Sequence, residues 1–238
     1  LAELASMIAP GVTTAQLDKR AEEFIRDHGA VPGFLGYNGF PNSICTSVNE
    51  QIVHGIPSDK TVLKDGDIIS IDCGAYINGF HGDSAYTFTV GEVKQEILDL
   101  LRITKESLYL GIEQAVEGKR LGDIGNAIQS HCEAHGYSVV REMIGHGVGR
   151  NLHESPEVPN YGRKGYGTLL KSGMTIAIEP MINLGKRHLV FEKDGWTTRT
   201  ADRMPSAHFE HSVAIRKGKA DILSSFEYVE HVLETKIN

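Results

Sequence analysis

One segment, residues 68–88, restricts the fold of this chain more than any other. Its sequence, IISIDCGAYINGFHGDSAYTF, places apolar residues on either side of the turn dipeptide Asn78-Gly79, which is the pattern of a β-hairpin. Each predicted strand carries one aspartate, Asp72 or Asp83, among apolar neighbours, and the segment has no Lys or Arg. Because a buried carboxylate is costly unless something pairs with it, the hairpin predicts a bound cation. For Asp83, close to the turn, a solvated turn aspartate is an equally good interpretation.

Composition narrows the classes of partner. The 238 residues carry a net charge of -7, which argues against nucleic acid or an anionic membrane as partner. The composition, with 26 glycines, is that of an ordinary globular protein. No apolar run approaches the roughly 20 residues of a membrane span. The three cysteines, Cys45, Cys73 and Cys132, lack a CxxC spacing and favour a reducing cytoplasm over a disulfide framework. The chain begins at Leu1 within a helical pattern, so we expect further residues before it in the natural protein.

Helix and strand signals alternate along the rest of the chain. Thr13 and Gln16 form a predicted capping box for a helix that ends at Gly29. Two amphipathic helices are predicted later, with apolar stripes over residues 97–118 and 124–136. Apolar strands are predicted at 43–48, 173–180 and 207–215. The aromatic residues of the loop 33–41 are interpreted as core packing, with an apolar pocket as the alternative.

Two further acids lie on the late strands. Glu179 ends the strand 173–180, and Glu210 lies in the middle of 207–215. Either acid alone is compatible with a core residue that is partnered by Arg187 or Arg203.

The glycine-rich sequence GHGVG at 145–149 surrounds His146 and predicts a close approach of another group to the backbone. It is GxGxG rather than GxGxxG, so it is weak evidence for dinucleotide binding. His153-Glu154 is not a zinc HExxH motif, because a proline two residues after the glutamate would break the required helix. His131 and His135 share one helix face and can bind zinc, but a solvated helix end is the preferred interpretation because no third ligand is near.

Four acids on apolar strands and one histidine in a glycine loop share a simpler explanation, a pair of metal ions. Hard divalent ions prefer carboxylates, and an imidazole adds affinity for transition metals. Five such ligands suffice for two ions about 3.5–4 Å apart, which lower the pKa of a shared water and polarise a carbonyl oxygen. This is the chemistry of a hydrolase.

The ordered motifs resemble those of the type I methionine aminopeptidases, which are pita-bread metallopeptidases. The resemblance runs from about Gly11 to Ile215 and rests on GVTTAQLD, NEQIVHGIP, IDCGAYINGFHGDSAYTF, GHGVGRNLHESP, GMTIAIEPM, DGWTTRTADR and SAHFEHS. It implies an α+β pita-bread (creatinase/aminopeptidase) fold: a pseudo-two-fold α/β sandwich with a curved antiparallel sheet and helices on its outer face. It also implies that residues 1–238 form a single catalytic domain.

The resemblance assigns metal roles to five residues. Asp72 would chelate one ion, Asp83 and Glu210 would bridge two divalent ions, and His146 and Glu179 would complete the shell of the second. The ions are cobalt, manganese, iron or zinc, and the water they activate would attack the peptide carbonyl.

It also assigns roles toward the substrate. Glu179 would act as general base, His153 would stabilise the oxyanion, and His54 would contact the substrate and assist proton transfer. The methionine side chain would lie in a pocket lined by Tyr37, Cys45, Met181 and Trp196. The chain departs from the family pattern at Phe34, Phe40, Leu152 and His208, the last of which often is a glutamine, so we expect a modified pocket shape.

The implied function is removal of the initiator methionine from nascent proteins when the second residue is small. The implied protein is a cytoplasmic monomer that meets the ribosome transiently, without direct nucleic-acid or membrane contact. One alternative is a pita-bread peptidase of the Xaa-Pro type, but such enzymes usually carry a large amino-terminal domain. The other is a non-catalytic binding protein on the same fold, but such relatives typically lose metal ligands and here all five are present. Type II members carry a helical insertion that is absent between Glu179 and Glu210.

Overall fold

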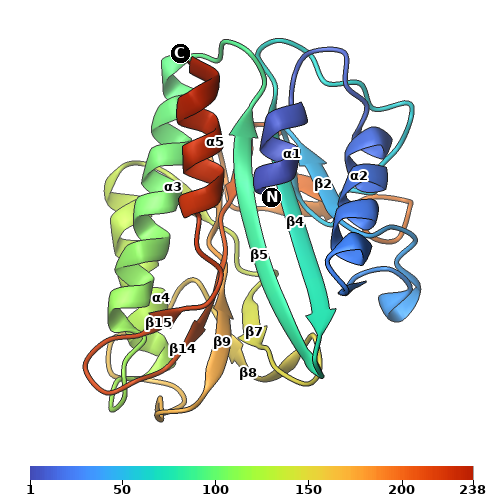
Figure 1. Ribbon diagram of the computed structural model, residues 1–238. Helices are drawn as coiled ribbons and strands as arrows, with labels where there is room; N and C mark the ends of the chain where they lie inside the picture. Colours follow the sequence, from blue (N-terminus) through green and yellow to red (C-terminus); the bar gives the residue numbers. More distant parts are fainter. Residues whose placement is uncertain (238) are drawn as a thin grey trace.

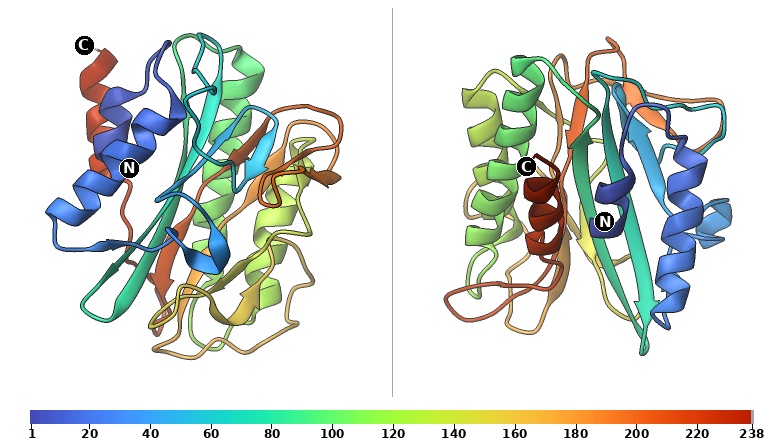
Figure 2. Two further views of the ribbon diagram at one scale, coloured as in Figure 1. Left: turned by 90° about the vertical axis from the view of Figure 1, so that its right-hand side faces the viewer. Right: turned by 45° about the horizontal axis from the view of Figure 1, so that its top comes forward.

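The computed structural model describes residues 1–237 and arranges helices on two sides of a set of antiparallel strands (Figure 1). Helices α3, α4 and α5 lie to the left of the strands β4 and β5 in Figure 1, α2 lies to their right, and α1 lies in front of them. Figure 2 shows α3 and α4 on one side of the strands and α2 on the other from two further directions. The helices are α1 (Ala2–Met7), α2 (Thr14–Asp27), the 3-10 helix η1 (Tyr37–Gly39), α3 (Gln95–Gln114), α4 (Leu121–Ala134) and α5 (Glu227–Ile237).

The strands form four sheets, which are antiparallel throughout. The first joins β1 (Val31–Pro32), β2 (Cys45–Val48), β4 (Ile68–Ile77) and β5 (Phe80–Thr89). The second sheet joins β6 (Ser138–Val139), β10 (Met181–Asn183) and β13 (Ser206–His208). The third joins β3 (Gln51–Val53), β11 (Leu189–Phe191) and β12 (Thr198–Thr200). The last joins β7 (Gly145–Gly147), β8 (Glu154–Val158), β9 (Thr175–Ile178), β14 (His211–Ala214) and β15 (Asp221–Ile222).

The central hairpin has the predicted turn. Asn78 and Gly79 both have positive φ, 53° and 87°, as a tight two-residue hairpin turn requires. In the register of β4 and β5, Asp72 lies opposite Ala85 and Gly74 lies opposite Asp83. Side chains of opposed residues share a face and alternate along each strand, so the two aspartates lie on the same face of the hairpin.

Beside that face, the outer edge of β5 meets the late strands through main-chain groups. The Asp83 N–H donates to Ser212 Oγ at 3.1 Å, and the Ser212 hydroxyl donates back to the Asp83 carbonyl at 2.8 Å. The Glu210 N–H donates to the Ala85 carbonyl at 2.9 Å. The opposite face carries Ile69, Ile71 and Phe88 into the main core, which also contains Leu4 of α1 and Leu17 of α2. The hairpin thus joins the two halves of the chain and separates a polar interior from the core.

Local sequence patterns predicted most of the helices, but tertiary contacts place some helix ends at other residues than predicted. The Thr13 capping box is present, with the Gln16 N–H donating to Thr13 Oγ1 at 3.3 Å. The helix predicted to end near Gly118 ends at Gln114, because the chain then forms bridges between Val116 and Arg216 and between Arg120 and Leu169.

The strand predicted over 207–215 is wrong as a continuous element. It is interrupted at Phe209-Glu210 between β13 and β14, where the Glu210 N–H bonds to β5 rather than to a neighbour of its own sheet. The strand predicted over 173–180 is shorter, β9, and Glu179 follows its last residue. Helix α5 was not predicted.

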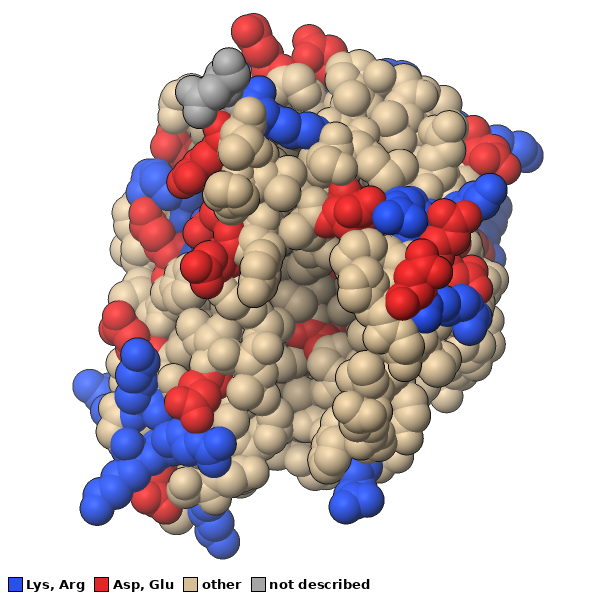
Figure 3. Space-filling view, viewed as in Figure 1, with Lys and Arg blue, Asp and Glu red and all other residues tan. Residues whose placement is uncertain are grey.

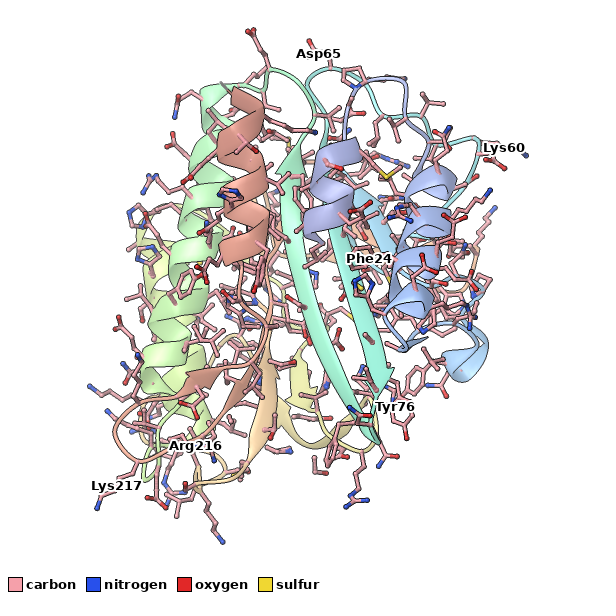
Figure 4. All side chains as sticks on the ribbon, viewed as in Figure 1. Phe24, Lys60, Asp65, Tyr76, Arg216 and Lys217 are labelled. Atoms are coloured by element: carbon pink, nitrogen blue, oxygen red, sulfur yellow. The ribbon has the colours of Figure 1, made fainter. Side chains whose placement is uncertain are left out.

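Charge is unevenly distributed over the surface. Figure 3 shows Lys and Arg side chains gathered at the lower left of this face, where Figure 4 labels Arg216 and Lys217 in the turn between β14 and β15. Lys171 is exposed in the segment whose Gly173 N–H bonds to the Ile215 carbonyl. A locally basic region therefore exists on a chain of net negative charge. Among the described residues, no helix combines the length and the apolar character needed to cross a bilayer.

Candidate metal centre

Four carboxylates from distant parts of the chain converge on one cavity. Asp72 and Asp83 come from the central hairpin, Glu179 follows β9, and Glu210 lies between β13 and β14. All four line a cavity of about 270 Å³ together with His146. Asp83 is only 4% exposed, so the interpretation of Asp83 as a solvated turn residue is wrong.

The backbone around His146 explains the glycines beside it. A Cβ on Gly145 would lie 2.3 Å from the Ala177 carbonyl oxygen, and one on Gly147 would lie 2.4 Å from the Ser155 carbonyl oxygen. Only glycine allows β7 to fit this closely between its neighbours. The ring of His146 lies with Nδ1 2.9 Å from the Gly147 carbonyl, to which it donates, so Nε2 is left with a free lone pair facing the acids.

The donor set fits divalent metal ions. His146 Nε2 lies 3.8 Å from Asp83 Oδ2 and 3.6 Å from Glu179 Oε1, too far for hydrogen bonds but suitable for two ligands of one ion. Ligand atoms of Asp83, His146 and Glu210 all lie within 4.8 Å of one another. One buried oxygen each of Asp72, Asp83 and Glu210 has no hydrogen-bond partner within residues 1–237.

No Lys or Arg of the described chain neutralises this cluster; the ion pairs of its acids involve only His146 and His208. Arg203, the alternative partner for a late acid, pairs instead with Glu50 at 3.2 Å. A group of buried acids without a cation of its own is the arrangement that a bound metal stabilises.

The pKa values of the cluster reflect the cost of burying several carboxylates close together. Burial raises the pKa of Asp72, Glu179 and Glu210 well above ordinary values, and the negative charge of Asp83 raises each of them further. Burial likewise raises the pKa of Asp83 to about 7. Burial, with a smaller contribution from His153, lowers the pKa of His146 to about 4, which leaves its imidazole neutral and able to bind a metal at pH 7.

These shifts predict that metal affinity rises with pH. A metal ion must displace the protons held by the raised carboxyls, whereas His146 is already neutral across this range. Asp83, with a pKa of about 7, goes from about one-tenth to about nine-tenths ionised between pH 6 and pH 8, which alone strengthens binding about tenfold. Calorimetric titration of metal-free protein with Mn²⁺ at both pH values checks this, and an affinity independent of pH would contradict it.

Three histidines and a tyrosine surround the cavity beside the acids. His153 Nδ1 lies 2.8 Å from the Tyr37 hydroxyl, and its ring centroid lies 4.1 Å from that of His146. His54 follows β3 with a positive φ of 59° and lines the cavity. Burial, and then His153, lower the pKa of His54 to about 4. Histidines that stay neutral at pH 7 can accept or donate one proton each toward a bound substrate.

Next to the acids the cavity has an apolar wall. Phe34, Phe40, Cys45 and Leu152 form one buried cluster with Tyr37, Ile56 and Trp196 packed against it. The rings of Phe40 and Trp196 meet edge to face at 5.1 Å. Both interpretations of the aromatic loop 33–41, core packing and an apolar pocket, are therefore correct: its rings pack together, and the packed rings line the cavity.

Met181 does not line the cavity. It is fully buried in a separate cluster with Ile52, Val53 and Val140, and only Val53 of these reaches the cavity wall. Sequence reasoning missed four lining residues, Asn38, Val53, Met143 and Ile144. The last two directly precede the GHGVG sequence, so their position was the available signal.

The zinc interpretation of His131 and His135 finds no support. His131 Nε2 lies 3.1 Å from Glu106 Oε2, and His135 is the C-cap residue that follows α4. In the described part of the chain, Asp83, His146 and Glu210 are the group whose ligand atoms meet the spacing for a metal ion.

Comparison with known proteins agrees with the fold. Residues 1–217 match the model of metallopeptidase family M24. The chain is 53% identical over 222 residues to methionine aminopeptidase 1 of Bacillus subtilis, covering 93% of this chain and 89% of the relative. The structure superposes on methionine aminopeptidase from Rickettsia prowazekii with a TM-score of 0.91 and 43% identity, over 96% of this chain and 92% of that one. Prolidase from Pyrococcus furiosus, at 23% identity and a TM-score of 0.70 over 95% of this chain and 60% of that one, shares the fold.

The chain belongs to the metallopeptidase family M24 and has its α+β pita-bread fold. Within that class it is a methionyl aminopeptidase, a hydrolase that releases the amino-terminal methionine of peptides. This agrees with the resemblance noted in the sequence and sets aside the non-catalytic alternative. The likeness to prolidase concerns the fold alone, so it does not favour the Xaa-Pro alternative.

Proposed function

We propose that this enzyme removes the initiator methionine from nascent proteins whose second residue is small, with two divalent metal ions. The observation that carries the proposal is the junction of two environments in one cavity. Buried acids that have no Lys or Arg partner among the described residues lie at one end, and an apolar aromatic wall lies at the other. A peptide that begins with methionine offers matching groups in the same order.

The proposed ligands are Asp72, Asp83, His146, Glu179 and Glu210. Asp83 and Glu210, whose ligand atoms cluster with His146, are the proposed shared ligands, and Asp72 is the proposed ligand of one ion alone. When bound, divalent ions supply a water of lowered pKa and a Lewis acid for the peptide carbonyl. Cobalt, manganese, iron and zinc all suit carboxylates with one imidazole.

The chain's own residues then move protons and orient the substrate. Glu179 is the proposed general base, since its carboxylate lies in the acid cluster and carries no hydrogen bond on its side chain within the described residues. If the Tyr37 hydroxyl donates to His153 Nδ1, then His153 Nε2 carries the proton and can donate it to the oxygen of the scissile carbonyl. His54 is the proposed contact for the amine end of the substrate.

The methionine side chain is proposed to lie against the wall formed by Cys45, Tyr37 and Trp196, with Phe34 and Phe40 completing it. A flexible thioether packs well on aromatic edges and sulfur. Met181 supports this wall through Val53 rather than by direct contact. The side chain of the second substrate residue would lie among Tyr37, His54 and His153, which favours a small one.

This arrangement predicts selectivity at the second residue. With Mn²⁺ bound, Met-Ala-Ser should be cleaved at least about 100-fold more efficiently than Met-Lys-Ser, a ratio within reach of steric exclusion. Release of methionine from each peptide, followed by chromatography, gives the two values of kcat/KM. Equal values would remove the small-residue restriction while leaving the aminopeptidase assignment intact.

The proposed setting is the cytoplasm, where nascent chains carry their methionine. The three cysteines Cys45, Cys73 and Cys132 are unpaired, which suits a reducing compartment. A monomer that meets the ribosome transiently remains the proposed assembly.

A further inference from the structure

One buried histidine has no role in the site described so far. His208 is 1% exposed, and its Nε2 has no hydrogen-bond partner among the described residues. Glu179 Oε2 lies 3.6 Å from that nitrogen, which is too far for a hydrogen bond. A buried ring nitrogen without a partner is unusual in a folded protein and calls for an explanation.

The backbone of His208 is held firmly by the central hairpin. Its N–H donates to Thr87 Oγ1 at 2.9 Å, and the Thr87 hydroxyl donates to its carbonyl at 2.7 Å. Since the one proton of Thr87 is used there, the 2.8 Å contact between Ser70 and Thr87 has Ser70 as donor. His208 also lies opposite Met181 in the pairing of β13 with β10. These contacts fix the main chain of His208, and with it the point from which its ring reaches toward Glu179.

The carboxylate of Glu179 lies between two imidazoles. Its Oε1 lies 3.6 Å from His146 Nε2, and its Oε2 lies 3.6 Å from His208 Nε2. The Asn160 amide holds the Glu179 main chain by donating to its carbonyl at 2.9 Å, so the side chain alone is free to turn. One oxygen faces the ligand cluster and the other faces His208.

We propose that His208 is a positioning residue for Glu179: its Nε2–H donates to Glu179 Oε2 and keeps Oε1 directed at the metal centre. This rests on the proposed ligand and base roles of Glu179. A hydrogen bond of this kind, from a group behind a metal ligand, fixes the ligand's rotamer and strengthens metal binding. The present 3.6 Å separation is longer than a hydrogen bond, and it would shorten once a bound metal ion held the carboxylate in place.

The proposal requires a hydrogen-bond donor at position 208 but does not require an imidazole ring. Glutamine at this position also offers an N–H at the end of a side chain of similar reach, whereas leucine fills the space without a donor. The matched control is His211, which is also fully buried but stacks on Phe226 with ring centroids 3.8 Å apart and contacts Ser224 rather than an acid of the cluster.

The experiment compares wild type, H208Q, H208L and H211L. Each protein is stripped with a chelator and titrated with Mn²⁺ in a calorimeter, and kcat and KM for Met-Ala-Ser are measured with Mn²⁺ in excess. H208L should bind Mn²⁺ about 10- to 100-fold more weakly and lose kcat with little change in KM. H208Q should stay within about threefold of wild type on both measures. H211L should melt at a lower temperature but bind Mn²⁺ like wild type.

Two results would overturn the proposal. In the first, H208L binds Mn²⁺ as tightly as wild type. In the second, H208Q is as impaired as H208L, which would show that the ring is needed for packing and not for its N–H. Failure of the proposed function looks different: wild type would then bind Mn²⁺ and leave Met-Ala-Ser intact, while the comparison of Mn²⁺ affinities would still test His208.

Discussion

Asp83→Asn is expected to weaken Mn²⁺ binding by at least about 100-fold and to abolish measurable methionine release at micromolar metal. The amide is nearly the same size as the carboxylate, and the hydrogen bonds to Ser212 come from the main chain of Asp83, so the hairpin keeps them. The cluster loses the charge of one proposed ligand, which lies close to His146 and Glu210. Metal content after dialysis and calorimetric titration measure the effect.

The same substitution has a second, opposite consequence for stability. Without metal, Asp83 repels its neighbours and raises the pKa of Asp72, Glu179 and Glu210. Removal of that charge should therefore raise the melting temperature of metal-free protein at pH 7, while the further rise that Mn²⁺ gives to wild type disappears. Asp99→Asn, on the exposed face of α3, is the control and should change neither quantity. Unchanged Mn²⁺ content in D83N would refute the shared-ligand assignment.

His153→Ala is expected to keep the metal and lose most of the turnover. His153 is exposed at the cavity rim, and its ring contacts Tyr37 and His146 without belonging to the ligand group. Loss of one donor to a developing oxyanion costs about 100- to 1,000-fold in kcat. Tyr37→Phe should cost less, because it removes the orienting hydroxyl and leaves the imidazole in place.

Metal analysis beside kinetics separates the two roles open to His153. If H153A holds less Mn²⁺ than wild type but is equally active per bound ion, His153 is a metal ligand and not an oxyanion donor. Thermal melting of both variants serves as the control for folding, and neither should shift by more than a few degrees because the side chain is not part of the core.

Local sequence signals located the hairpin because its information lies within one short segment. The Asn78-Gly79 turn and the alternation of apolar residues fix the register, and the register puts Asp72 and Asp83 on one face. The capping box at Thr13 was found for the same reason. The late acids lie close to the hairpin only in the tertiary structure. The sequence predicted this indirectly, because buried acids without a basic partner indicated a shared metal site.

Features that depend on distant contacts escaped sequence reasoning. The break at Glu210 exists because its N–H bonds to the Ala85 carbonyl, which no periodicity reveals. His208 was noted only as a departure from the family pattern, and its contact with Glu179 appears once β13 and β10 are paired. The family resemblance placed Met181 in the pocket wall, but its side chain is buried in a separate cluster with Val53.

Metal dependence of methionine release tests the central claim most directly. Protein stripped by a chelator is incubated with Met-Ala-Ser and with Ala-Pro-Ser, before and after stepwise addition of Mn²⁺ or Co²⁺. The account predicts no release from stripped protein, release of methionine from Met-Ala-Ser that grows with bound metal up to about two ions per chain, and no cleavage of Ala-Pro-Ser. Methionine release that survives complete removal of metal, or cleavage of Ala-Pro-Ser in place of Met-Ala-Ser, would contradict it.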